Sequence, residues 1–523
     1  MKKLAVKPRR PKLKKSRANR RETGLRDVDL SVLRMLLASG QQGESLEDMI
    51  DEFLELRPEG LKDMPDAEAM SSLAGELERL RIDANGGDPE ARETLAAARD
   101  KIGRAARRDE IHPSALVVLG RLFAGSQVDI GDGARALMGR YLEGGLFPEP
   151  GEESHRTLVK PLLGSFADDP FEAHEELRSL IAIFPLKYKV SLIEALAADT
   201  DAHAVQTGVG FLLDPEAPLA LAAIRGLAAS AARGTLDAQA RRRIEMIRPW
   251  LAATLRDALD QAVPRAEAGA ALTGGANIVR ASASACDGSG ASGLFLRIKR
   301  GSRFAFVSLM AKPQGLTECL LLDDLPEREV AAIEHSAGAS TGVRVVPLAA
   351  WTKLLRLALG RNVTRGAPPP FALVQALETA GVDSLAPDIA TTAEILDSAL
   401  AGMAGEDDSA AVTEAHEAVV ASDAADGWFE AGESVEAVLR TTESAEEGAQ
   451  ALLEGYLQGR RSFWAAQCAL SSLALHDGSA SGRRDGADFA VVGRDILQDT
   501  PLADIPLMRQ IADRSAMVFF ARS

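Results

Sequence analysis

The stretch Asn277-Ile-Val-Arg-Ala-Ser-Ala-Ser-Ala-Cys286, Asp287-Gly-Ser-Gly290, Gly293-Leu-Phe-Leu-Arg-Ile-Lys299 opens the part of the chain that decides the fold. It continues through Arg303-Phe-Ala-Phe-Val-Ser-Leu-Met310 and then from Leu316 to Leu322. Four short runs separated by glycine turns are typical of an antiparallel meander. We therefore predict a small antiparallel β insertion over residues 277–325, to which the run 343–346 can add one more strand.

Helical periodicity dominates on both sides of this insertion. Apolar residues recur at helical spacing near the start of the chain, at Leu30, Leu33, Leu36 and Leu37. Several predicted helices begin with Asp followed by Pro, a favourable pairing because proline lacks the N–H that would be left unpaired in the first turn. The sequence therefore predicts a mainly α protein, and its 523 residues suggest about three folding units.

One helix start recurs, at Asp88-Pro89, Asp169-Pro170 and Asp214-Pro215, with the prolines 81 and 45 residues apart. These spacings are about two periods and one period of a helix-pair repeat of roughly 40 to 47 residues. The best single unit is Leu192–Leu227, which contains an Asp-Pro break and an alanine-rich second helix. It resembles a HEAT-type repeat, in which small residues let two helices approach closely. The resemblance implies a short helical-repeat array, and a compact α bundle is the alternative.

Composition divides the chain into segments. Gly405–Gly432 contains eight acids and no Lys or Arg, which indicates an acidic linker or a solvated helix. In the C-terminal region, the apolar stripe that includes Trp464 and Cys468 is predicted to be core. The predicted segments are a disordered basic arm (1–24), a HEAT-like helical array (25–262), the β insertion (277–325), a helical region (326–404), the acidic linker (405–432) and a C-terminal helical region (433–523).

The charge of the chain is distributed unevenly. The formal net charge is -16, yet residues 1–21 carry eleven Lys or Arg and no acid, so the remainder has 49 basic against 76 acidic residues. Such an arm can neutralise nucleic-acid phosphates without base selectivity, because it lacks aromatic residues that stack on bases. It can equally be a solubilising tail, a partner of the acidic body or a targeting address. The candidate nucleic-acid contacts are Lys2, Lys3, Lys7, Arg9, Arg10, Lys12, Lys14, Lys15, Arg17, Arg20 and Arg21.

Motifs for catalysis or metal binding fail in their context. Gly288-Ser-Gly290-Ala-Ser-Gly293 fits GxGxxG, but a strand follows where a dinucleotide-binding motif opens a helix, so we predict a flexible β-turn. Gly338-Ala-Ser340-Thr-Gly342 fits the nucleophile elbow GxSxG, but here a helix precedes the serine and a strand-like run follows it. Three scattered cysteines predict buried reduced thiols. We predict no cofactor, no metal and no catalytic residue, and the sequence leaves enzymatic activity open while favouring a non-catalytic protein.

No stretch of 18 apolar residues and no secretory signal is visible, so we expect a cytoplasmic protein that does not bind a membrane. Stacked helix pairs expose extended surfaces suited to macromolecular binding. The sequence therefore predicts a protein-interaction or adaptor protein with a protein partner. Nucleic-acid association through the basic arm is one alternative, and an enzyme without a recognisable motif is another.

Overall fold

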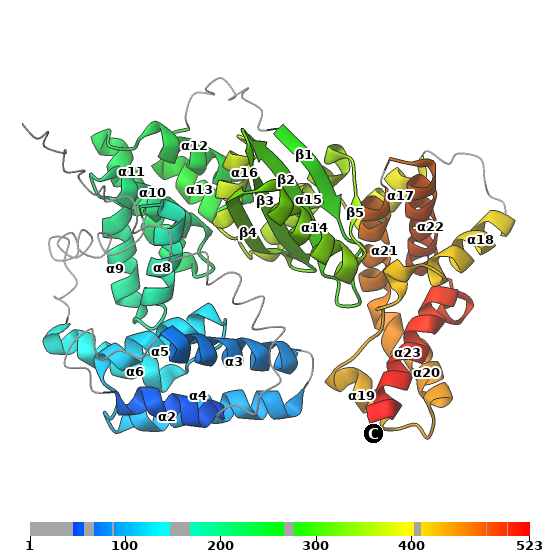
Figure 1. The fold of residues 1–523 in the computed structure, drawn as a ribbon, viewed down its shortest axis with the longest axis horizontal. Helices are drawn as coiled ribbons and strands as arrows, with labels where there is room; N and C mark the ends of the chain where they lie inside the picture. Colours follow the sequence, from blue (N-terminus) through cyan, green and yellow to red (C-terminus); the bar gives the residue numbers. More distant parts are fainter. Residues whose placement is uncertain are drawn as a thin grey trace, which may run out of the picture. The chain divides into compact units, whose positions relative to one another are not determined.

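The computed structural model describes residues 45–56, 67–85, 88–146, 168–265, 277–401, 409–476, 478–498 and 500–522. It confirms the predicted fold class, a mainly helical chain with a small antiparallel sheet and a C-terminal helical region (Figure 1). Contacts divide the chain into two compact units, residues 1–137 and residues 138–523. None of the helices in the ranges given above combines the length and the apolar character that a membrane span requires.

The first unit contains helices that pack on one another around a hydrophobic core. Asp88 caps α4 by accepting hydrogen bonds from two backbone N–H groups, and Pro89 occupies its first turn, as the Asp-Pro pattern predicts. Ile50, Leu77 and Ile102 are fully buried between the helices. The helices are α2 (Leu46–Glu55), α3 (Ala67–Asn85), α4 (Pro89–Arg107) and α5 (Pro113–Gly125), and α6 (Asp132–Tyr141) spans the boundary to the second unit.

The second unit begins with a helix stack, which runs from α8 to α13. Its helices alternate between two layers: α8, α10 and α12 contact one another in sequence, and so do α9, α11 and α13. We call these the α10 layer and the α11 layer. The bounds are α8 (Pro170–Ile181), α9 (Leu186–Ala197), α10 (Ala202–Gly210), η4 (Phe211–Leu213), α11 (Ala217–Arg233), α12 (Ala238–Ile247), η5 (Arg248–Trp250) and α13 (Ala253–Ala262).

Small residues permit the close packing of this stack. A Cβ added at Gly208 would lie 2.8 Å from the Cα of Ala197, and one at Gly226 would lie 2.5 Å from the carbonyl oxygen of Glu194. Real Cβ atoms do not approach backbone atoms this closely, so α9 accepts its two neighbours only because both positions are glycine. The alanine-rich and glycine-rich composition of this segment thus has a packing cause.

The sheet has five antiparallel strands in the order β4-β3-β2-β1-β5. Four of them form the predicted meander, because β1, β2, β3 and β4 pair in sequence order, and the run 343–346 supplies the fifth. Gly301 has φ +62° in the turn between β2 and β3, a conformation that glycine adopts without strain. The strands are β1 (Asn277–Ala283), β2 (Ser292–Arg300), β3 (Arg303–Lys312), β4 (Gly315–Leu325) and β5 (Arg344–Val345).

Helices cover both faces of the sheet. On one face, Phe304 and Phe306 form a buried cluster with Val330 of α14 (Glu327–Thr341). Strand residues alternate between faces, so Leu296 and Leu309, which are almost completely buried, point to the other face. There α15 (Leu348–Arg365) contacts β1, β3 and β4, and α16 (Ala372–Thr379) contacts β4.

The C-terminal helical region is built around aromatic side chains. Trp428 and Trp464 are fully buried with ring centroids 5.3 Å apart, and Phe489 meets Trp428 edge-on. The predicted core stripe is therefore core at Trp464 and at Cys468, both fully buried. The helices are α17 (Thr392–Leu400), α18 (Ser409–Val420), α19 (Glu433–Leu439), α20 (Ala445–Glu454), α21 (Arg461–Leu475), α22 (Ala480–Leu497) and α23 (Pro506–Arg522).

The segment 405–432, predicted as an acidic linker, differs from a linker in its described part. Residues from Ser409 form α18, which packs against α22 and α23. Val419 and Trp428 are buried, and the carboxylate of Glu430 accepts hydrogen bonds from Arg460 and Trp464. The acids of α18 lie mainly on its exposed side while its small apolar residues pack inward, so acidic composition alone does not indicate a linker here.

Candidate functional site

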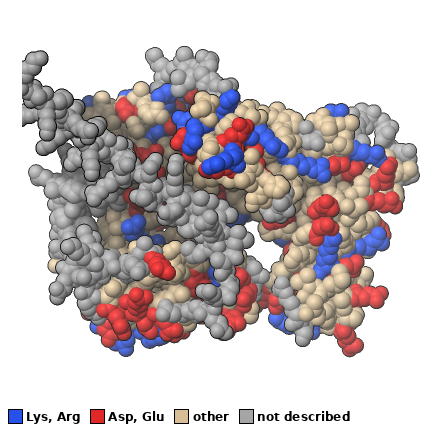
Figure 2. All heavy atoms as spheres, viewed as in Figure 1, with Lys and Arg blue, Asp and Glu red and all other residues tan. Residues whose placement is uncertain are grey.

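The predicted nucleic-acid contacts, Lys2 to Arg21, lie outside the described residues. A second basic group, on the hairpin of β2 and β3, is described and is paired with acids. Arg303 Nε lies 3.0 Å from Asp324 Oδ1, Arg300 pairs with Asp323, and Arg297 Nη2 lies 2.9 Å from Glu327 Oε1. Figure 2 shows Lys and Arg side chains interspersed with Asp and Glu on this face. The hairpin therefore does not present an unbalanced positive patch for phosphates.

The glycine loop between β1 and β2 is closed by its own carboxylate. Asp287 Oδ1 accepts hydrogen bonds from the backbone N–H groups of Ser289 and Ala291, each at 2.9 Å. A Cβ at Gly288 would lie 2.6 Å from the carbonyl oxygen of Gly427, so the loop packs against the C-terminal helical region rather than projecting as the predicted flexible turn. The amides that a phosphate would need are occupied by Asp287, which explains why GxGxxG is not a phosphate site here.

The GxSxG match lies within a helix. Ser340 belongs to the last turn of α14, which ends at Gly342 with φ +60°. A nucleophile elbow needs a strand before the serine and a helix after it, so this backbone cannot present Ser340 in that way. Within the described ranges, no group of three or more His, Cys, Asp or Glu side chains is placed to hold a metal ion. The cysteines are free thiols, and burial raises the pKa of Cys286 to about 12.

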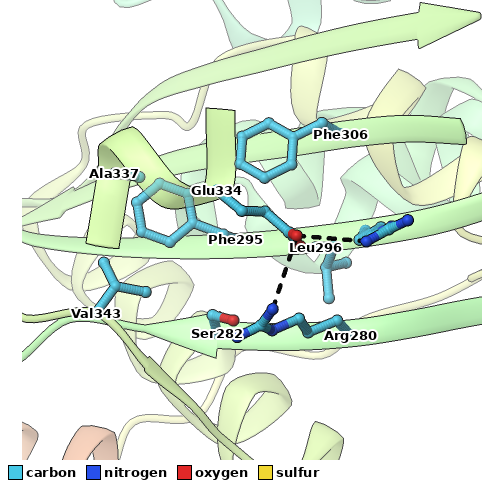
Figure 3. Close-up of a pocket in the computed structure, with 9 residues that line it drawn as sticks. Arg280, Ser282, Phe295, Leu296, Phe306, Glu334, Ala337 and Val343 are labelled. Carbon is cyan, nitrogen blue, oxygen red and sulfur yellow. Dashed lines mark hydrogen bonds and ion pairs between the residues drawn. The ribbon is translucent and has the colours of Figure 1, made fainter. Parts of the chain in front are cut away.

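A charged pocket lies between α14 and the face of the sheet (Figure 3). It is a recess open to solvent, and it combines apolar walls with charged groups. Glu334 extends from α14, and its Oε2 lies 3.4 Å from Nη1 of Arg297 and 3.7 Å from Nη1 of Arg280. The lining residues are Arg280, Ser282, Phe295, Leu296, Arg297, Phe306, Glu334, Ala337 and Val343.

The strand alternation puts the pocket's polar groups side by side. Arg280 of β1 pairs in register with Arg297 of β2, and Ser282 pairs with Phe295, so all four side chains point to the α14 face. Arg297 is also stacked on the ring of Phe304, with its guanidinium carbon 4.4 Å from the ring centroid. The pocket thus presents two guanidinium groups and a hydroxyl beside aromatic rings.

The α10 layer of the helix stack is covered by the segment that follows the sheet. Arg243 of α12 makes a bidentate ion pair with Glu378 of α16, with both N–O distances 2.9 Å, and its side chain is only 7% exposed. The guanidinium also lies over the ring of Phe171. Trp250 Nε1 donates to the carbonyl oxygen of Leu385. This polar network fixes α16 on the α10 layer, so that face is not available to another protein.

His174 lies in an aromatic cluster at the same junction. Its ring meets Phe211 and Phe371 edge-on, and Nε2 is buried without a hydrogen-bond partner among the described residues. Burial, together with the positive charge of the nearby Arg178, lowers the pKa of His174 to about 3. A Cβ added at Gly210 would lie 2.4 Å from the His174 ring, so the contact is tight. The histidine is therefore a neutral packing residue in the covered face.

The α11 layer presents apolar side chains to solvent. Leu186 at the start of α9 is 44% exposed, and Leu221 of α11 is 38% exposed. Arg225 Nη2 and Glu194 Oε2 form an exposed ion pair between these two helices at 2.6 Å. Two adjacent helices thus carry exposed leucines with a charged pair nearby. An exposed leucine is common on soluble proteins, and what distinguishes this surface is that the opposite layer is covered.

Two segments of the chain match known protein families. Residues 391–520 match the family described as the Y4lR C-terminal helical domain, and residues 185–269 match the Y4lR second domain. No curated protein and no solved structure matches the chain. The second match contains α9 to α13, and the first contains nearly all of the C-terminal helical region from α17 onward. The sheet and α14, α15 and α16 lie between the two matched segments.

Proposed function

We propose that this chain is a non-catalytic protein-interaction or adaptor protein whose partner binds the α11 layer. The observation that most strongly supports this proposal is a contrast between the two layers. The chain itself covers the α10 layer through Arg243 and Glu378, while Leu186 and Leu221 are exposed on the α11 layer. The alternation of helices between two layers also supports a HEAT-like repeat, in which binding is spread over an extended surface.

The character of the surface indicates the kind of partner. Leu186 and Leu221 can be covered by apolar side chains, and neighbouring charges of both signs, such as Lys187 and Glu194, can form the polar rim that interfaces need. Because exposed ion pairs contribute little energy, the leucines should supply most of the affinity. The proposed partner is therefore a protein with a complementary apolar patch.

Co-purification from the native host tests this proposal. The tagged full chain is compared with the double variant Leu186→Ser, Leu221→Ser and with a matched control, Leu348→Ser, Ile389→Ser. The control residues are exposed hydrophobics outside the helix stack, 44% and 67% exposed. We expect a defined protein to accompany the wild type and the control, and its yield to fall at least about tenfold with the first variant. Equal recovery by both variants would contradict binding through the α11 layer.

Nucleic-acid association through the basic arm is a separate proposal, which rests on eleven cations within residues 1–21. Binding of a short duplex DNA and of a single-stranded RNA is measured with the full chain and with a deletion of residues 1–21. We expect the affinity to fall steeply between 50 and 200 mM salt, because each phosphate contact releases about one counterion. We also expect the deletion to abolish binding. Salt-insensitive binding, or binding retained after the deletion, would exclude the arm as the contact.

A further inference from the structure

The pocket between α14 and the sheet is lined by two arginines and one glutamate. Two guanidinium groups, from Arg280 and Arg297, share the single carboxylate of Glu334, and Arg297 has a second acid in Glu327. Arg280 is the more accessible of the two, because its side chain is 46% exposed against 12% for Arg297, and its ion pair among the described residues is a 3.7 Å contact. The pocket therefore retains a guanidinium that can pair with an incoming anion.

The walls beside this guanidinium are apolar. Phe295 and Phe306 are stacked with ring centroids 6.0 Å apart, and Val343 also lines the pocket (Figure 3). Ser282 adds a hydroxyl that can donate to an oxygen of the ligand. Such a site fits a ligand with an anionic head and an apolar body.

We propose that this pocket binds a small organic carboxylate with an aromatic or branched apolar group. Its carboxylate pairs with Arg280, where a planar guanidinium can offer two parallel N–H donors, and its apolar group lies against Phe295 and Phe306. Glu334 is a competitor within the pocket, since its carboxylate already lies between the two guanidinium groups. Binding of the ligand goes beyond the proposed adaptor function and does not depend on it.

Isothermal titration calorimetry of the full chain tests the proposal with phenylacetate, its neutral isostere phenylacetamide and inorganic phosphate as probes. Phenylacetate is expected to bind at least about tenfold more tightly than the amide, because a charge-assisted pair with Arg280 is lost in the amide. It is also expected to bind more tightly than phosphate, which has no apolar group. Equal affinity for acid and amide, or undetectable binding of phenylacetate, would overturn the proposal. Phosphate binding at least as tight as that of phenylacetate would overturn the apolar part of the site.

Variants give a sharper answer because two residues should act in opposite directions. Arg280→Ala is expected to weaken phenylacetate binding at least about tenfold, whereas Glu334→Gln is expected to strengthen it several-fold by removing the internal competitor. Arg303→Ala is the matched control, since Arg303 pairs with Asp324 outside the pocket. Each variant's thermal unfolding is measured to confirm that it folds. Unchanged affinity in Arg280→Ala, or weaker binding in a folded Glu334→Gln variant, would contradict the assignment.

Discussion

The two layers of the helix stack differ in what covers them. In the α10 layer, Arg243 is buried in a bidentate pair with Glu378, and His174 lies among aromatic rings, where no described residue bonds its Nε2. In the α11 layer, Arg225 forms a pair of the same type with Glu194, but both side chains are exposed. The same two residue types thus form a buried pair in one layer and an exposed pair in the other. Burial rather than residue type therefore separates structural from candidate functional positions in this stack.

The largest expected effect is the loss of stability when Arg243 of the α10 layer is replaced. Arg243→Ala leaves the Glu378 carboxylate without its partner at a buried junction, so we expect the free energy of unfolding to fall by about 3 kcal/mol. The loss of packing on Phe171 adds to the effect. Urea denaturation of the full chain, followed by circular dichroism, measures this change. A loss below about 1 kcal/mol would mean that α16 does not hold the α10 layer as described.

The pH dependence of stability should follow from His174. Its folded-state pKa of about 3 lies below the unfolded value of about 6.5, so the unfolded chain binds the extra proton first. The contribution of His174 to stability is therefore complete above about pH 6.5 and falls as the pH drops towards 3, by about 2 kcal/mol at pH 5. We expect His174→Gln to remove this part of the pH dependence, measured by denaturation at pH 7 and pH 5.

The exposed His335 provides the control for that experiment, as His335→Gln. If both variants retain the wild-type difference between pH 7 and pH 5, the buried histidine is not its source. If only the His335 variant reduces the stability difference between pH 7 and pH 5, His174 in the α10 layer plays no part in the pH response.

The smallest expected effect is the change in stability when Arg225 of the α11 layer is replaced. Arg225→Ala removes an exposed ion pair with Glu194, and such pairs contribute about 0.5 kcal/mol or less. The midpoint of urea unfolding should therefore hardly change, while high salt should remove what effect there is. A loss as large as that of Arg243→Ala would contradict the distinction between the layers.

Local signals in the sequence predicted much of the fold. Glycines at the turns, such as Gly301 and Gly315, separate the strands, and the meander needs only neighbouring strands to pair. Asp88 and Asp169 begin helices as the Asp-Pro pattern predicts, because capping is a local interaction. The acidic segment 405–432 was harder to interpret, since its charged residues hide the inward-facing Val419 and Trp428.

The candidate sites depend on contacts between distant residues, so the sequence did not single them out. Arg243 and Glu378 are 135 residues apart, and their pairing decides which layer is covered. Leu221 lies in an alanine-rich helical run where an exposed leucine and a buried one look alike. The helical phase relative to the buried Leu219 and Ile224 is a signal that could have indicated Leu221. The eleven basic residues of the arm were conspicuous in sequence and lie outside the described residues.

Site-specific photo-crosslinking in the native host tests whether a partner protein binds the α11 layer. A photoreactive amino acid replaces Leu221 in the open layer or, as a matched exposed position outside the stack, Ile389. We expect a discrete crosslinked protein from position 221 and none of the same mass from position 389. A product that forms equally at both positions, or only at position 389, would contradict the α11 layer as the interaction surface.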